Sequence, residues 1–161
     1  MGVRTSSRVD GALVLVLNNT PDAIEQARQE ITAHLQHLRL SLRTINHLEV
    51  ILEELVSNVL RYGLEPGGEH SILVAVTANP ERILVVVEDD GVPFDPFSRE
   101  DPAAPSSLED AKVGGLGIPL VRRFSTDVRY EREPRSAAWR QMVDERRGPI
   151  NRVAVTLAAA S

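Results

Sequence analysis

A glutamate and an asparagine four residues apart are the first residues in this sequence that suggest chemistry. Glu54 and Asn58 lie in a run of helix-forming residues, and side chains at this spacing share one face of a helix. The Glu54 carboxylate could accept a proton from a hydroxyl group or from water. The Asn58 side chain offers a carbonyl oxygen, a ligand type that Mg²⁺ accepts. Taken alone, the pair fits the solvated polar face of an amphipathic helix at least as well as a reactive site.

A second candidate segment runs from Asp89 to Asp95, directly after a β-rich run. A carboxylate at the end of a strand, such as that of Asp89, can accept a hydrogen bond from an exocyclic amine like that of adenine. Gly91 has no Cβ and would let the backbone approach a ligand closely. Because Asp-Gly is also a common turn pair, this segment alone indicates a turn more readily than a ligand site.

A third candidate segment contains three glycines, Gly114, Gly115 and Gly117, at the expected start of a helix. Helix N-termini present free N–H groups and a partial positive charge, which suit phosphate. The spacing differs from the P-loop, which needs Lys and Ser/Thr after its second glycine, whereas Pro119-Leu120 stands here. It also differs from the dinucleotide-binding fingerprint, because no strand immediately precedes it.

The elements that must position these residues follow from the hydrophobic pattern. A strand is expected over Gly11–Asn18. Thr20 is expected to cap a first helix that has Pro21 in its first turn. A second helix begins near Ser41, carries Glu54 and Asn58, and ends at Gly63. Two further strands read as a hairpin with a turn at residues 79–81, and a long loop with the character of a lid covers residues 96–113. The remaining expected elements are strands at Ser71–Thr77, Ile83–Glu88, Val128–Glu131 and Arg152–Leu157, and a helix at Ile118–Phe124.

This order of elements predicts an α+β fold, a two-layer sandwich, because the helices are segregated from hairpin-connected strands. Residues 1–10 are polar and are expected to form a flexible N-terminal arm, with residues 11–161 as a single domain. The segment Glu133–Ile150 separates the last two strands and contains Trp139. It is either a surface insertion or an element that binds a partner or a second copy.

The composition narrows the class of protein further. The 161 residues carry a net charge of -5, which shows no sign of the basic surface of a nucleic-acid binder. The absence of cysteine excludes disulfides and thiolate metal sites. No apolar run is long enough to span a bilayer, so a cytoplasmic protein is expected.

Together and in this order, the three candidate segments resemble the N box and the two glycine boxes of the GHKL ATPase superfamily, which includes gyrase, histidine kinases, mismatch-repair proteins and heat-shock chaperones. The sequence ELVSNVLRYG at 54–63, the segment DDGVPFDP at 89–96, and GGLGIPLVRRFSTDVRYER at 114–132 with the late Asn151-Arg152 are similar to the stand-alone anti-sigma-factor serine/threonine-protein kinases. The resemblance covers roughly residues 11–157. Pro93 stands where many members of the wider superfamily have a second glycine.

The resemblance implies a Bergerat fold, in which a mixed sheet is covered on one face by helices, and ATP and Mg²⁺ bind between the helices and a lid. It implies a sigma factor and an anti-anti-sigma (STAS-type) protein as partners, and it allows a homodimer. The implied roles are Glu54 as general base, Asn58 as magnesium ligand, Asp89 as the acceptor for the adenine amine with Gly91 beside it, Gly115 and Gly117 beside the phosphates, and Lys112 toward the γ-phosphate.

The leading hypothesis is therefore a serine/threonine-protein kinase that binds a sigma factor and phosphorylates an anti-anti-sigma partner. The first alternative is a non-catalytic ATP-binding module that controls a partner by binding alone. The second is a detached catalytic domain of a histidine kinase. The sequence disfavours it because His34, His37 and His47 read as ordinary helix histidines rather than as a phosphoacceptor.

Overall fold

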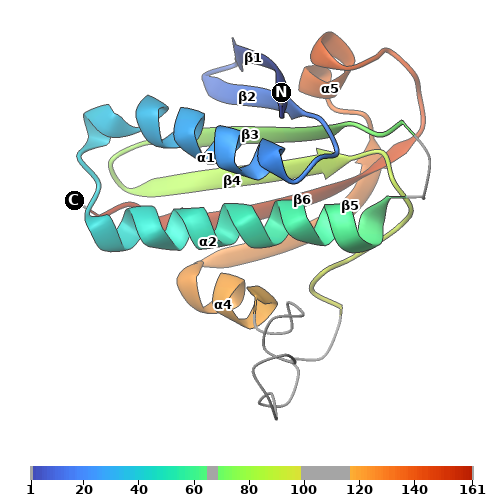
Figure 1. Ribbon diagram of the computed structural model, residues 1–161. Helices are drawn as coiled ribbons and strands as arrows, with labels where there is room; N and C mark the ends of the chain where they lie inside the picture. Colours follow the sequence, from blue (N-terminus) through green and yellow to red (C-terminus); the bar gives the residue numbers. More distant parts are fainter. Residues whose placement is uncertain (1, 65–68, 99–116, 161) are drawn as a thin grey trace.

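The computed structural model describes residues 2–64, 69–98 and 117–160, in which a six-stranded sheet has the order β1-β2-β3-β4-β6-β5 (Figure 1). All five strand pairings are antiparallel. The strands are β1 (Val3–Val9), β2 (Ala12–Leu17), β3 (Ile72–Ala78), β4 (Arg82–Asp89), β5 (Asp127–Pro134) and β6 (Pro149–Ala158). The helical elements are α1 (Asp22–His34), η1 (Gln36–Leu38), α2 (Leu42–Asn58), η2 (Val59–Gly63), α4 (Gly117–Phe124) and α5 (Ala137–Met142).

Helices α1, α2 and α4 cover one face of the sheet, with α2 between the other two (Figure 1). The main core lies between these layers. The apolar stripe of α2, including Leu48, Leu52 and Leu55, packs there against inward-facing strand residues such as Leu15 and Val85. The α+β two-layer architecture expected from the sequence is confirmed.

Two details of the expected sheet are corrected. The sheet is antiparallel in its described part rather than mixed, because hairpins connect neighbouring strands and β6 runs back between β4 and β5. The other face is also not bare. The short helix α5 places the fully buried Trp139 against Val14, Leu73 and Ile150 on that face. The segment between the last two strands therefore supplies part of a second, smaller core.

The expectation of a flexible arm at residues 1–10 is wrong for Val3–Val9, which form the edge strand β1 paired with β2. Asp10 and Gly11 both have positive φ values and form the tight turn between the two strands. Asp-Gly is favoured in such hairpin turns. Gly2 is buried so closely against Ala23 of α1 that a Cβ would overlap its backbone. The strand is polar because most of its side chains are exposed.

The helix that carries the candidate site is well defined at both ends. Ser41 caps α2, since its Oγ accepts a hydrogen bond from the Thr44 N–H at 3.1 Å. A single π-helical turn, η2, ends the helical run at Gly63, as the sequence predicted. The expected cap of the first helix is wrong: α1 begins at Asp22 after Pro21, and no side chain caps it.

Among the helices of the described residues, none is long and apolar enough to cross a membrane.

Candidate functional site

Helix α2 brings Glu54 and Asn58 to one face, where both side chains are poorly hydrated. Asn58 is 6% exposed, and its Nδ2 has no hydrogen-bond partner within the described part of the chain. The same holds for Oε2 of Glu54, which is also buried. A buried polar atom without a partner is uncommon because its desolvation is not offset. The two atoms therefore mark a face that fits a polar ligand.

The environment of Glu54 raises the pKa of its carboxyl group. Burial raises the pKa of its carboxyl above the ordinary value, Arg61 opposes this shift, and the neighbouring Glu53 adds to it. A carboxylate with a raised pKa accepts a proton more readily, which suits a general base.

The first residue of α4, Gly117, packs directly on the Glu54 carboxylate. A Cβ at Gly117 would overlap Oε2 and Cδ of Glu54, so only glycine allows this approach. Helix α4 is held on α2 by a stack of His47 on Phe124, with ring centroids 3.8 Å apart and planes 4° apart. Val121 in the same helix is fully buried. The packing of α4 therefore brings Gly117 against Glu54.

The carboxylate of Asp89 lies at the end of β4 and is 4% exposed. Its Oδ1 accepts hydrogen bonds from Gly91 N at 2.9 Å and from Asn151 Nδ2 at 3.0 Å. Burial raises the pKa of Asp89 to about 6, against the lowering effect of these two hydrogen bonds. Both of these hydrogen bonds from described residues go to Oδ1 and not to Oδ2.

Gly91 joins the Asp89 segment to the end of the helical run on which Glu54 lies. A Cβ at Gly91 would overlap the carbonyl oxygen of Gly63, and Val92 N donates to that same oxygen at 2.8 Å. A Cβ at Gly63 would in turn lie 3.7 Å from Asp89 Oδ1. The close approach of two glycines therefore connects the two candidate segments at one end of the sheet.

Asn151 on β6 is a site residue to which the sequence analysis gave no role. It is 1% exposed. Its Nδ2 donates to Asp89 Oδ1 and to Val92 O, and its Oδ1 accepts from Tyr130 Oη at 2.5 Å and Arg132 Nη1 at 3.0 Å. The sequence did contain a signal, because asparagine is disfavoured within a strand and Asn151 begins the final apolar run.

Three of the expected features lie outside the described residues. Lys112 and Gly115 fall in 99–116, as does most of the lid expected over 96–113. Gly117 is the first described residue after that gap. The structure therefore brings together Glu54 and Gly117 at one contact, and Asp89 and Gly91 at another. Among the described residues, no three His, Cys, Asp or Glu side chains gather as a metal site.

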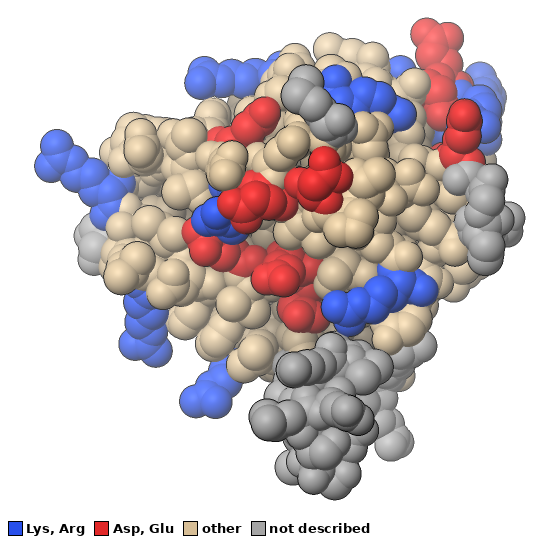
Figure 2. All heavy atoms as spheres, viewed as in Figure 1, with Lys and Arg blue, Asp and Glu red and all other residues tan. Residues whose placement is uncertain are grey.

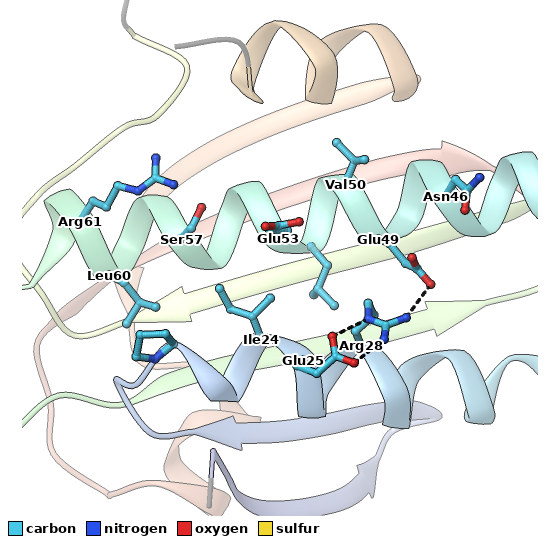
Figure 3. A pocket seen from close by; sticks show the side chains of 12 residues that line it. Ile24, Glu25, Arg28, Asn46, Glu49, Val50, Glu53, Ser57, Leu60 and Arg61 are labelled. Carbon is cyan, nitrogen blue, oxygen red and sulfur yellow. Dashed lines mark hydrogen bonds and ion pairs between the residues drawn. The ribbon is translucent and has the colours of Figure 1, made fainter. Parts of the chain in front are cut away.

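A groove of about 740 Å³ lies on the α1 side of α2, away from the contact between Glu54 and Gly117 (Figure 3). Arg28 of α1 bonds to Glu25 in the same helix and to Glu49 of α2, the latter at 3.1 Å. Glu53 and the apolar Ile24 also line the groove. Figure 2 shows acidic side chains gathered over this face. Arg61 lines the groove as well, so the lining mixes carboxylates with guanidinium groups.

Comparison with known families decides the class of this fold. The family model of the histidine kinase-like ATPase domain matches residues 17–141, which is more than half of the chain. The chain belongs to this family. The match includes Glu54, Asn58, Asp89 and Gly117 but ends before Asn151.

The relatives in the family include protein kinases with low sequence identity. Serine/threonine-protein kinase BtrW of Bordetella bronchiseptica is 28% identical over 102 residues, which cover 61% of this chain and 72% of BtrW. Serine-protein kinase RsbW of Listeria monocytogenes is 24% identical over 139 residues, covering 83% of this chain and 88% of RsbW. The chain is thus a kinase-like member of the ATPase family.

A solved structure is also similar to this chain. The histidine kinase domain of the blue-light activated histidine kinase EL346 from Erythrobacter litoralis aligns with a TM-score of 0.42 and 15% identity. The alignment covers 72% of this chain and 45% of that chain.

Proposed function

We propose that this protein is an ATP-dependent serine/threonine-protein kinase that regulates a sigma factor. It would bind the sigma factor in one state and phosphorylate an anti-anti-sigma protein in another, in the cytoplasm, where sigma factors act. The observation that carries the proposal is the partly buried Glu54 carboxylate, whose Oε2 has no partner among the described residues and faces Gly117. The names of the relatives support the class of activity.

Asp89 would bind the adenine of ATP. Its Oδ1 is occupied by Gly91 and Asn151, so Oδ2 would accept a hydrogen bond from the exocyclic amine. Gly91, packed against the Gly63 carbonyl, would hold the backbone after Asp89 in place. Gly115 and Gly117 would lie beside the phosphates, and Lys112 would reach toward the γ-phosphate.

Glu54 would act as general base. It would take the proton from a serine hydroxyl of the partner while the hydroxyl oxygen forms a bond to the γ-phosphorus, and the bond to the β–γ bridging oxygen breaks to release ADP. Mg²⁺, when bound, would neutralise charge on the phosphates. Asn58 would provide one oxygen ligand for it, and the phosphates and water would provide the rest, as is usual for this ion.

The groove between α1 and α2 supports the regulatory half of the proposal. Glu25, Glu49 and Glu53 line it together with Arg28 and Arg61, beside apolar residues such as Ile24. Because Arg28 pairs with Glu25 and Glu49, Glu53 is the carboxylate that we expect to meet a basic residue of an amphipathic partner segment. The groove lies on the α1 side of α2, whereas Glu54 contacts Gly117 in α4. A protein bound in this groove would leave the nucleotide site open. Glu53→Lys should therefore weaken partner binding, measured by titration, and leave Mg-ATP affinity unchanged.

The alternative is a module that binds ATP but transfers no phosphate. Incubation of the protein with labelled Mg-ATP and a candidate anti-anti-sigma protein separates the two functions. The kinase proposal expects a labelled partner, and Glu54→Gln should lower the labelling rate at least 100-fold. Glu81→Gln is the matched control, since this carboxylate is exposed in the turn between β3 and β4 and its loss should leave the rate unchanged. ATP binding without any labelled partner would favour the alternative.

Asp89→Asn tests the nucleotide site itself. The bonds from Gly91 and Asn151 would hold the amide oxygen where Oδ1 now lies, so the amide NH₂ would replace Oδ2. Two donors would then face each other, and Mg-ATP affinity should fall by roughly 10- to 100-fold, as for a buried unmade hydrogen bond. Calorimetric titration measures this. Unchanged affinity in the variant would remove Asp89 from the adenine site.

A further inference from the structure

Strand β4 ends with the carboxylates Glu88 and Asp89, and Asp90 follows directly after it. The segment Glu133–Ile150 contacts Glu88 and Asp90. Glu88 is 2% exposed, Asp89 is 4% exposed, and the side chain of Asp90 is 9% exposed. Carboxylates buried to this extent need partners. Because side chains alternate along a strand, Glu88 and Asp89 point to opposite faces of the sheet.

Glu88 is held on the face that carries α5. Ser136 Oγ donates to Glu88 Oε1 at 2.7 Å, and Arg152 Nε donates to Glu88 Oε2 at 2.7 Å. Arg152 also donates to Glu133 Oε2 at 2.6 Å. The hydroxyl of Ser136 has a second role, because it accepts the Trp139 N–H at 3.0 Å and so caps α5. One hydroxyl group therefore links the first turn of α5 to the buried carboxylate of Glu88.

Asp90 is contacted from the other end of the same segment. Its Oδ1 accepts from Ser71 N at 3.2 Å and pairs with His70 Nδ1 at 3.3 Å. Arg146 approaches its Oδ2 at 3.9 Å and is itself held by Asp144 at 2.9 Å. The Arg146 side chain is 69% exposed, so this pair is weak, and the firm contact of the segment is the one that Ser136 makes with Glu88, the residue before Asp89.

The register of β4 and β6 makes this restraint act on the nucleotide site. Glu88 pairs with Arg152, and Asp89 pairs with Asn151. Arg152 binds Glu88 on the face of the sheet that carries α5. Asn151 binds Asp89 on the opposite face, which carries α1, α2 and α4. A shift of Glu88 would turn the peptide that carries Asp89, and with it the direction of Oδ2.

We propose that the segment Glu133–Ile150 is a positioning element for nucleotide binding, in which Ser136 holds Glu88 so that Asp89 presents Oδ2 to the adenine amine. The inference rests on the proposed binding of ATP. Ser136 is a positioning residue, since it acts through Glu88 and touches no nucleotide.

The test compares ATP with inosine triphosphate, which has a carbonyl oxygen in place of the amine. The wild type should prefer ATP, and Ser136→Ala should lower Mg-ATP affinity about 5- to 10-fold while affinity for inosine triphosphate stays the same or rises. The preference for ATP should therefore fall by at least fivefold. Ser136→Thr keeps a hydroxyl group that can cap α5 and bond to Glu88, and it should restore the preference.

Trp139→Phe is the control for a purely structural effect. It loosens the packing of α5 but leaves the hydroxyl of Ser136 in place, so both affinities should change together, if at all. Should Ser136→Ala fail to fold, Glu88→Gln tests the same link, because its amide no longer accepts from both Ser136 and Arg152. The preference should then fall at least twofold.

Failure of the inference and failure of the proposed function give different results. If the wild type binds no Mg-ATP, both are overturned. If the wild type prefers ATP and Ser136→Ala keeps the full preference, only the positioning role is overturned. A Trp139→Phe variant that loses the preference as strongly as Ser136→Ala would also contradict it, since packing alone would then explain the effect.

Discussion

At the scale of single residues, the site combines buried carboxyl groups with glycines that allow close approach. Asp89 is buried and Glu54 is partly buried, and burial raises the pKa of both. Gly117 and Gly91 each occupy a position where any Cβ would overlap a neighbour, the Glu54 carboxylate in one case and the Gly63 carbonyl in the other. The fold thus accepts an energetic penalty at positions where a ligand would offset it, which is typical of binding and catalytic sites.

The ionisation of Asp89 should make adenine binding depend on pH. Only the ionised carboxylate accepts from the amine, and its pKa in the free protein is about 6. Affinity should be constant above pH 7 and about tenfold weaker at pH 5, where roughly a tenth of the groups are ionised. An NMR titration with adenosine measures this without the titration of phosphate. A flat profile between pH 5 and pH 7 would contradict the assignment.

The raised pKa of Asp89 should also affect the stability of the free protein, which should be higher when this carboxyl group is protonated. The folded state holds the Asp89 proton more tightly than the unfolded chain does, because the pKa rises from 3.8 to about 6. Ionisation therefore costs about 3 kcal/mol of stability at pH 7. That cost decreases as the pH falls through 6 toward 4. Urea unfolding of Asp89→Asn, compared with the wild type at pH 7, should show a more stable variant.

Gly117→Ala should separate catalysis from folding. The atoms that the new Cβ would meet are the end of the flexible Glu54 side chain, so the carboxylate can swing away with a stability loss of about 1 kcal/mol or less. Phosphoryl transfer should fall at least tenfold because the base is displaced. Labelling kinetics and thermal unfolding measure the two effects. An active variant would show that the position of the Glu54 carboxylate is not critical.

At the scale of elements, helix α2 contributes to both candidate surfaces. Glu54 and Asn58 face the α4 side, while Glu49 and Glu53 line the groove on the α1 side. The helix is fixed by its apolar stripe and by the cap at Ser41. A substitution that shifts α2 should therefore affect both the proposed nucleotide site and the groove.

Loss of the Ser41 cap should be measurable as a change in stability. Ser41→Ala removes the acceptor for the Thr44 N–H, a bond within a partly buried first turn, and should destabilise the protein by about 1 kcal/mol. Ser41→Asp should retain most of the cap. Chemical unfolding measures both variants, with Ser6→Ala on the exposed face of β1 as a control that should have little effect. Equal stability of Ser41→Ala and the wild type would show that the cap is not significant.

At the scale of the whole molecule, both faces of the sheet are packed. Three helices build the main core on one face, and Trp139 anchors α5 in a smaller core on the other. The segment between β5 and β6 is therefore an integral part of the fold rather than a surface insertion. That packing is what brings Ser136 to Glu88, on the reverse side of the strand that carries Asp89.

Trp139→Ala should destabilise the protein by about 3–5 kcal/mol, because a fully buried indole leaves a large cavity. Urea denaturation measures the loss, with Leu42→Ala as control, since Leu42 is 74% exposed and its removal should cost about 0.5 kcal/mol or less. A loss below about 1 kcal/mol would mean that α5 is only loosely attached.

The amino-acid sequence was sufficient to predict the elements whose periodicity is strong. The apolar stripe of α2, its start near Ser41 and the hairpin of β3 and β4 were all expected from spacing and turn residues, and the structure confirms them. These features depend on interactions within a few residues, which a sequence displays directly. Strand β1 was missed because an edge strand with exposed side chains lacks the apolar alternation, although Asp10-Gly11 was a usable hairpin signal.

The sequence also determined which residue types were present for a nucleotide site, and in which order. The tertiary structure decided how they meet: Gly117 on Glu54, Gly63 beside Gly91, and Asn151 on Asp89. These contacts join positions between 28 and 63 residues apart, and only the packing of helices and the register of strands bring them together. The second core around Trp139 was equally a tertiary outcome, because no local pattern tells which face of the sheet a short helix will cover.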